Sequence, residues 1–248
     1  MLNGARPFFT RLMTPVGEAL ARTPITPNMI TVTGTVGLCA GVLWGYPTGH
    51  LFWGTVVATF FVFTDMLDGV LARLKGTSGK FGAFLDSTMD RVADAAVFSG
   101  LAIWFVLGGH SRLMAVVSLF CLVAGALVSY VKARAEGLGT TANVGIAERP
   151  ERLVLTFTVT GLWGLGVPYI LPAGLWVLAV ASVITLFQRI VAVHKGLAVP
   201  PPSPDAAVPP PPGGQAAETK AAETKAAETK AAETKADTGS AAAAHTTE

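Results

Sequence analysis

The sequence predicts an all-α, polytopic membrane protein with six transmembrane helices, preceded by an N-terminal amphipathic helix in the membrane interface. Hydrophobic residues make up 51% of the 248 residues and charged residues only 14%, whereas soluble domains are about one quarter charged. Six apolar stretches approach the length of about 20 residues that a helix needs to cross a bilayer. None of them alternates apolar and polar residues like a membrane β-strand. Helices therefore remain the structure that satisfies the backbone in lipid.

The first element, residues 1–22, mixes apolar side chains with Arg6, Arg11 and Arg22. It carries too many charges to span a membrane and lacks the uninterrupted apolar centre of a cleavable signal peptide. We expect an amphipathic helix that lies in the interface, with its arginines towards lipid headgroups. The following turn contains two prolines, and Thr26 or Asn28 can cap the next helix.

The domain that follows, residues 23–196, holds the six predicted spans. They cover residues 28–46, 50–74, 82–107, 113–134, 152–170 and 173–194. Most Lys and Arg residues fall at one end of these spans, so the positive-inside rule places that end in the cytoplasm. Six crossings then leave both termini in the cytoplasm of a multi-pass protein in the cell membrane.

The last segment, residues 197–248, differs sharply in composition. It is Pro-rich and then repeats Ala-Ala-Glu-Thr-Lys four times. It has no apolar stripe to bury, which predicts a disordered tail. Residues 1–199 carry 14 Lys and Arg against 9 Asp and Glu, a net charge of +5. In a membrane domain this balance indicates anionic headgroups or phosphorylated substrates as partners rather than nucleic acid.

The most informative residues are acids inside predicted spans: Asp65, Asp68, Asp86, Asp90 and Asp94. One carboxylate at mid-bilayer costs about 2.5–3.5 kcal/mol even on a lenient scale, so these side chains must face a hydrated cavity. Asp65 and Asp68 share one helix face, as do Asp86 and Asp90 on the next helix. The short connection between these helices predicts antiparallel neighbours, with the two pairs meeting across one interface.

A cluster of four carboxylates needs cations, and hard divalent ions prefer oxygen ligands. Two Mg²⁺ ions, with Mn²⁺ as an alternative, balance four negative charges, and paired metals suit phosphoryl chemistry. The competing interpretation is a set of interhelical ion pairs with Arg73 and Arg91. We expect such a structural role only for Asp94. A carboxylate-lined divalent cation transporter is a further alternative, but it predicts acids along a whole path rather than at one membrane face.

Residues 65–90 follow the pattern D-x2-D-G-x2-A-R-x8-G-x3-D-x3-D at all eight fixed positions. This pattern resembles the signature of the CDP-alcohol phosphotransferases. The resemblance implies a six-helix membrane enzyme, usually a homodimer, that transfers a phospholipid group from a CDP-linked donor to an alcohol and releases CMP. It also implies that Asp65, Asp68 and Asp86 bind the metals, and that Asp90 binds the second metal and acts as general base.

The same resemblance implies a binding site for the donor, CDP-diacylglycerol. Its contacts would come from Gly69, Arg73 and the loop at Gly79, together with the start of the first span. That start comprises Asn28, Met29, Ile30 and Thr31.

The acceptor is indicated by basic residues near the cytoplasmic ends of the last three spans, which suit an acceptor that carries a phosphate. Residues 129–136 and 148–152 closely resemble the actinobacterial phosphatidylinositol phosphate synthases, whose acceptor is an inositol phosphate. By that resemblance the phosphate would be held by Ser129, Lys132, Arg152 and Arg189. Glycerol 3-phosphate is the alternative acceptor, because it would also need a basic pocket.

Overall fold

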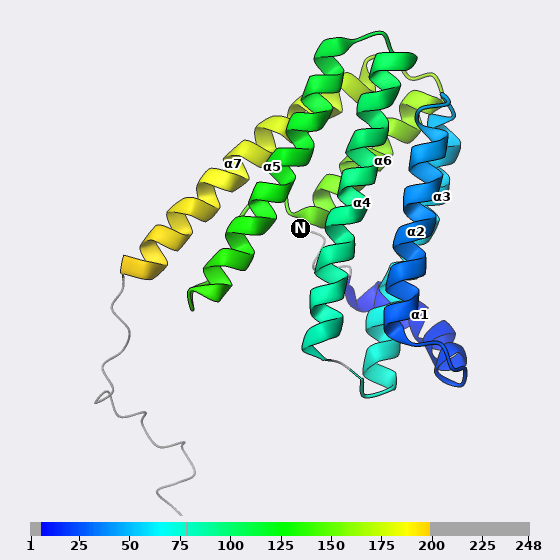
Figure 1. The fold of residues 1–248 in the computed structure, drawn as a ribbon, viewed down its shortest axis with the longest axis vertical. Helices are drawn as coiled ribbons and strands as arrows, with labels where there is room; N and C mark the ends of the chain where they lie inside the picture. Colours follow the sequence, from blue (N-terminus) through cyan, green and yellow to red (C-terminus); the bar gives the residue numbers. More distant parts are fainter. Residues whose placement is uncertain (1–5, 78, 199–248) are drawn as a thin grey trace, which may run out of the picture. The chain divides into compact units, whose positions relative to one another are not determined.

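The computed structural model describes residues 6–77 and 79–198, and over these ranges all its regular structure is α-helical (Figure 1). The helices are α1 (Arg6–Ala21), α2 (Pro27–Gly45), α3 (Leu51–Leu74), α4 (Lys80–Leu107), α5 (Arg112–Gly137), α6 (Arg149–Gly164) and α7 (Ile170–Ala198). Each predicted span therefore corresponds to one helix. The largest difference is at α6, which begins and ends earlier than the predicted 152–170.

The predicted interfacial segment contains α1, which packs against α3. Residues 1–5 of that segment lie outside the described residues. The predicted tail also lies outside them, from residue 199 onward.

Four of the helices, α2, α3, α5 and α7, are long and apolar enough to cross a membrane. The protein is thus a multi-pass membrane protein. The two remaining predicted spans are less clear by these criteria. Helix α6 has only 16 residues, and α4 carries five charged residues between Lys80 and Asp94.

The helix ends are specified by local sequence. Thr26 accepts a hydrogen bond from the Met29 amide at 3.3 Å and so caps α2, which confirms one of the two predicted caps. Helix α3 ends because Gly76 adopts a φ of +64°. The amides of Gly76 and Thr77 then bond back to the carbonyls of Arg73 and Ala72, at 3.3 and 3.0 Å. This Schellman arrangement stops the helix directly after the signature Arg73.

Helix α2 packs against both α3 and α4. A row of glycines on α2 allows the close approach to α3. At Gly45, for example, a Cβ atom would lie only 2.7 Å from the Cα atom of Gly54. On the other side, a Cβ atom at Gly100 of α4 would lie 3.2 Å from the Val42 carbonyl oxygen. Small residues at these positions let the backbones pack closely.

The α3–α4 pair is not among the extensively packed helix pairs of the described chain. The two helices predicted to be antiparallel neighbours therefore have few direct contacts with each other. They run in opposite directions, as expected (Figure 1), but α2 contacts both. Their side chains can then meet across a space rather than in a dry interface.

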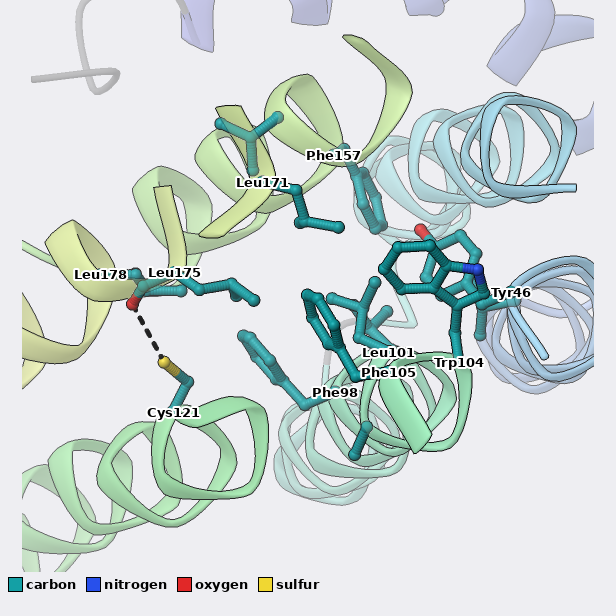
Figure 2. Close-up of a cluster of buried hydrophobic side chains, with 14 of the residues drawn as sticks. Tyr46, Phe98, Leu101, Trp104, Phe105, Cys121, Phe157, Leu171, Leu175 and Leu178 are labelled. Atoms are coloured by element: carbon teal, nitrogen blue, oxygen red, sulfur yellow. Dashed lines mark hydrogen bonds between the residues drawn. The ribbon is translucent and has the colours of Figure 1, made fainter. Parts of the chain in front are cut away.

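The hydrophobic core lies away from that space. Figure 2 shows Phe98, Leu101, Trp104 and Phe105 of α4 packed near the apolar side chains of α6 and α7. Burial on α4 begins only at Ala93, and residues 80–92 are exposed or partly exposed. The bundle is thus closely packed at one end and open at the end where the acids lie.

Candidate functional site

Three carboxylates come together near the open end of the bundle. Oxygen atoms of Asp65, Asp68 and Asp86 lie within 4.8 Å of one another. Helix geometry explains why Asp68 and Asp86 lie at the same level along their two helices. Asp68 precedes the last residue of α3 by six residues, and Asp86 follows the first residue of α4 by six, so each lies about 9 Å from its helix end. Because the helices are antiparallel, the two acids reach the same level.

The residues of this triad fit a divalent cation. The Asp65 Oδ1 atom is buried and has no hydrogen-bond partner within the described chain. An unpartnered carboxylate oxygen beside two further carboxylates is unfavourable unless a cation compensates it. The ligand set consists of oxygen atoms only, which hard cations such as Mg²⁺ and Mn²⁺ prefer.

The Thr31 side chain orients one member of the triad. Its hydroxyl donates to Asp68 Oδ2. Thr31 is buried on the first turns of α2, so this contact links α2 to the α3 acid pair. Hydrogen bonds of this kind fix a ligating carboxylate, and their loss typically lowers metal affinity 10- to 100-fold.

We expect Thr31→Val to weaken Mn²⁺ binding about tenfold, because Asp68 loses the hydroxyl that orients it. Titration of the purified protein with Mn²⁺, followed by electron paramagnetic resonance of the free ion, measures this. Thr33→Val is the matched control, since the exposed Thr33 hydroxyl bonds only to its own helix, at Met29 O and Ile30 O. Equal affinities for the two variants would contradict the role given to Thr31.

Asp90 lies close to the triad but outside it. Its Oδ1 atom accepts an ion pair from Arg149 Nη1 at 2.7 Å, and Arg91 Nη2 approaches its other oxygen at 3.6 Å. Asp90, Arg149 and Asp65 line the same small cavity, together with Gly34. The structure therefore brings three of the four predicted ligands together and gives the fourth a cationic partner.

Asp94 has the structural role that its position predicted, but its described ion pairs are with α6 rather than with Arg91. Arg152 Nη2 approaches Asp94 Oδ2 at 3.1 Å, and Arg149 Nε approaches Oδ1 at 3.4 Å. Asp90, Arg149, Asp94 and Arg152 thus form one chain of alternating charges between α4 and the start of α6.

The predicted donor contacts gather around the triad. Asn28 lies at the start of α2, and its Oδ1 atom would be 3.6 Å from a Cβ atom at Gly82 of the signature. Arg73 and Gly79 are exposed near the triad end of α3 and α4. Space beside Gly69 is open, with only Arg73 Nη1 approaching, 3.9 Å from a Cβ at that position.

Met29 and Ile30 complete the predicted donor set but differ in exposure. Met29 is 54% exposed, whereas Ile30 is 8% exposed and belongs to the buried residues of α2. Of these two side chains, Met29 is the one open to a ligand.

The four predicted acceptor residues also differ in exposure and in the hydrogen bonds that they form within the protein. Lys132 is partly exposed, and Ser129 donates to the Gly125 carbonyl at 3.1 Å. Arg152 is 2% exposed and lies against Gly125, where a Cβ atom would lie 3.2 Å from its guanidinium. Its Nη1 atom is buried without a partner within the described chain.

Arg189 uses all three guanidinium nitrogens inside the protein. They donate to Val144 O at 2.9 Å, to Val128 O at 2.8 Å and to Glu148 Oε1 at 3.2 Å. This side chain thereby ties α7 to Val128 within α5 and to the residue that precedes α6. It holds the start of α6 in place beside the acids.

A comparison with known protein families decides the identity of the fold. The model of the CDP-alcohol phosphatidyltransferase family matches residues 24–187, which covers more than half of the chain. This protein belongs to the CDP-alcohol phosphatidyltransferase family. The matched range contains the acid triad, Asp90 and the start of α6.

Among curated members of this family, the phosphatidylinositol phosphate synthase of Streptomyces avermitilis is 48% identical over 203 residues, covering 79% of this chain and 83% of the relative. The enzyme of the same name from Mycolicibacterium smegmatis is 46% identical over 76% of this chain and 86% of its own length.

Solved structures agree with this placement. A crystal structure of Mycobacterium tuberculosis phosphatidylinositol phosphate synthase with CDP-DAG bound has a TM-score of 0.72 and 44% identity, covering 75% of this chain and 94% of that chain. A second structure of that enzyme, with manganese and citrate, also has a TM-score of 0.72 and 44% identity, over 74% and 89% of the two chains.

The sequence pattern did not indicate the pairing of Arg149 with Asp90, nor the contact from Thr31 to Asp68. The spacing of residues does give an indication of the Arg149 contacts. Arg149 and Arg152 are spaced by three residues, and Asp90 and Asp94 by four, so each pair lies on one helix face. Two matched pairs of opposite charge indicate that the faces meet, but the spacing alone does not say which acid takes which arginine.

Proposed function

We propose that this protein transfers the phosphatidyl group of CDP-diacylglycerol to 1D-myo-inositol 3-phosphate and releases CMP. The observation that carries the proposal is that Asp65 of the acid triad lines one cavity with Asp90 and Arg149, while Arg152 lies buried three residues further along α6. A site that holds divalent cations and also presents buried guanidinium groups suits a diphosphate donor and a phosphorylated acceptor. Curated relatives at 46–48% identity carry the name of this activity.

In this reaction the acceptor hydroxyl oxygen forms a bond to the phosphatidyl phosphorus, and the bond from that phosphorus to the CMP oxygen breaks. Asp90 takes the hydroxyl proton, since its carboxylate lines the same small cavity as Asp65 of the triad. Asp65, Asp68 and Asp86 would hold two Mg²⁺ ions with Asp90, and Mn²⁺ can replace them. When bound, the ions neutralise the diphosphate and stabilise the leaving oxygen of CMP.

The remaining residues orient the two substrates. We assign the CDP contacts to Gly69, Arg73, Gly79 and the first turn of α2, residues 28–31. We assign the acceptor phosphate to Ser129, Lys132 and Arg152, and we assign Arg189, the fourth predicted residue, a positioning role. Arg152 supports this assignment with a buried, unpartnered Nη1 donor, whereas Arg189 contributes through the backbone that it holds in place.

We further propose that α4 and α6 cross the membrane together with the four clear spans, and that the catalytic domain covers residues 23–196. The open end of the bundle then faces the cytoplasm with both termini, because most basic residues lie there. The charges of α4 lie between Lys80 and Asp94, towards that end, so they do not need to face lipid. The active form would be a homodimer.

A CMP-release assay tests this function. The purified protein is supplied with CDP-diacylglycerol, Mg²⁺ and one acceptor at a time: inositol 3-phosphate, glycerol 3-phosphate, free inositol or serine. We expect release with inositol 3-phosphate. Faster release with glycerol 3-phosphate would reassign the acceptor, and no release with any acceptor would refute the proposal.

Removal of divalent cations gives a second test. We expect excess EDTA to abolish CMP release, because the triad cannot neutralise the diphosphate without them. Either Mg²⁺ or Mn²⁺, added back in excess over the chelator, should restore the activity, since both accept oxygen ligands. Full activity in EDTA would contradict the proposed metal site.

A further inference from the structure

The chain of charges between α4 and α6 contains one residue without an assigned role, Arg149. Its Nη1 atom lies 2.7 Å from Asp90 Oδ1, and its Nε atom lies 3.4 Å from Asp94 Oδ1. The shorter contact is therefore with the proposed fourth metal ligand. A charge-assisted contact of this length is among the strong hydrogen bonds.

Arg149 can leave Asp90 at little cost to the fold. Asp94 keeps its second partner, since Arg152 Nη2 lies 3.1 Å from its other oxygen. The side chain of Arg149 is 22% exposed, whereas that of Arg152 is 2% exposed. Arg149 is also the first residue of α6, so its partly exposed side chain lies at the end of the helix rather than within it.

Asp90 cannot serve Arg149 and a divalent cation equally. Arg149 Nη1 lies 2.7 Å from Asp90 Oδ1, and a guanidinium this close to the carboxylate repels a second cation that would bind to it. Cation binding at Asp90 and the Asp90–Arg149 pair are therefore coupled equilibria.

We propose that Arg149 is a positioning residue that neutralises Asp90 when no cation is bound, competes with the second divalent cation for it, and is released by that cation towards the phosphate of the acceptor. This inference rests on the proposed function, because it takes Asp90 as a metal ligand. It adds an order of events: the acceptor meets its full set of cationic groups only after the metal site is filled. Arg149 then stands beside Arg152, three residues further along α6.

The test is Mn²⁺ binding to the full chain in detergent, without either substrate, followed by electron paramagnetic resonance. We expect Arg149→Gln to bind the more weakly held Mn²⁺ about tenfold more tightly than the unaltered protein, because Asp90 loses its competitor. We expect the same variant to have a higher acceptor KM and an unchanged donor KM. A gain in metal affinity with a loss in acceptor affinity is not the result of general misfolding, which would weaken both.

Two further variants show whether the gain acts through Asp90. Arg134→Gln removes one exposed positive charge in the last turn of α5, and it should leave Mn²⁺ affinity unchanged. In an Asp90→Asn background, Arg149→Gln should give no gain, since the contested oxygen is no longer charged. An equal gain in Arg134→Gln, or a full gain in the Asp90→Asn background, would overturn the proposal.

Arg149→Lys provides the test if Arg149→Gln does not fold. The shorter, unforked side chain cannot contact Asp90 and Asp94 together, so we expect a smaller gain of about threefold in Mn²⁺ affinity. Unchanged or weaker Mn²⁺ binding in this folded variant would overturn the proposal. Because this readout needs no turnover, an altered Mn²⁺ affinity with no CMP release by the unaltered protein would refute the proposed function alone.

Discussion

Asp90→Asn is expected to lower the rate of CMP release by about 10²–10⁴-fold, because an amide cannot take the proton of the acceptor hydroxyl. The fold should persist, since the amide oxygen can still accept from Arg149 Nη1, which now lies 2.7 Å from Asp90 Oδ1. CMP release with saturating CDP-diacylglycerol and acceptor measures the effect, and the melting temperature in detergent checks the fold.

Glu136→Gln is the matched control for this experiment. Glu136 is an exposed acid in the last turn of α5 and belongs neither to the acid triad nor to the chain of charges. Its loss should therefore leave CMP release unchanged. Turnover by Asp90→Asn within a factor of three of the unaltered protein would remove Asp90 from the role of base.

Asp94→Ala is expected to be the most destabilising of these changes. Asp94 is 6% exposed and is the carboxylate paired with Arg152, which is 2% exposed. Loss of one partner of a buried ion pair typically costs about 3–5 kcal/mol, because the other charge stays buried without compensation. For a domain of this size, such a loss lowers the melting temperature by about 10 °C.

A double variant separates the structural from the functional share of this pair. Asp94→Leu with Arg152→Met replaces both charges by apolar side chains, and such replacements are often neutral for stability. We expect the melting temperature to recover in the double variant and the acceptor KM to stay high, because the Arg152 guanidinium is missing. Recovery of both would show that Arg152 serves stability only, and recovery of neither would show that the site tolerates no apolar pair.

Much of this architecture could be predicted from local patterns. The six apolar stretches each contain a helix because hydropathy and length constrain a membrane helix more strongly than any tertiary contact does. The grouping of Asp65 with Asp68 follows from helical spacing alone. The meeting of this pair with Asp86 follows once the two helices are known to be antiparallel and joined by a short loop.

Contacts between helices could be predicted from the sequence much less well. The glycine row of α2 is visible in the sequence, yet only packing shows that it faces α3 and leaves α2 in contact with both α3 and α4. Arg189 was predicted to face a ligand, while the structure gives its nitrogens to Val128, Val144 and Glu148. Two of these partners, Val128 and Val144, accept through backbone carbonyls, which no pattern of residue types can predict.

The order of residues alone establishes the class of protein, the position of the helices and the acids that share one helix face, since each depends on spacing within a single helix. The partner of each charge depended on the fold. Whether Asp90 joins the triad or pairs with Arg149 is set by the depth and rotation of α6 against α4. Those quantities arise from packing between residues more than 50 positions apart, and a guanidinium within 3 Å of a carboxylate is a matter of such packing rather than of periodicity.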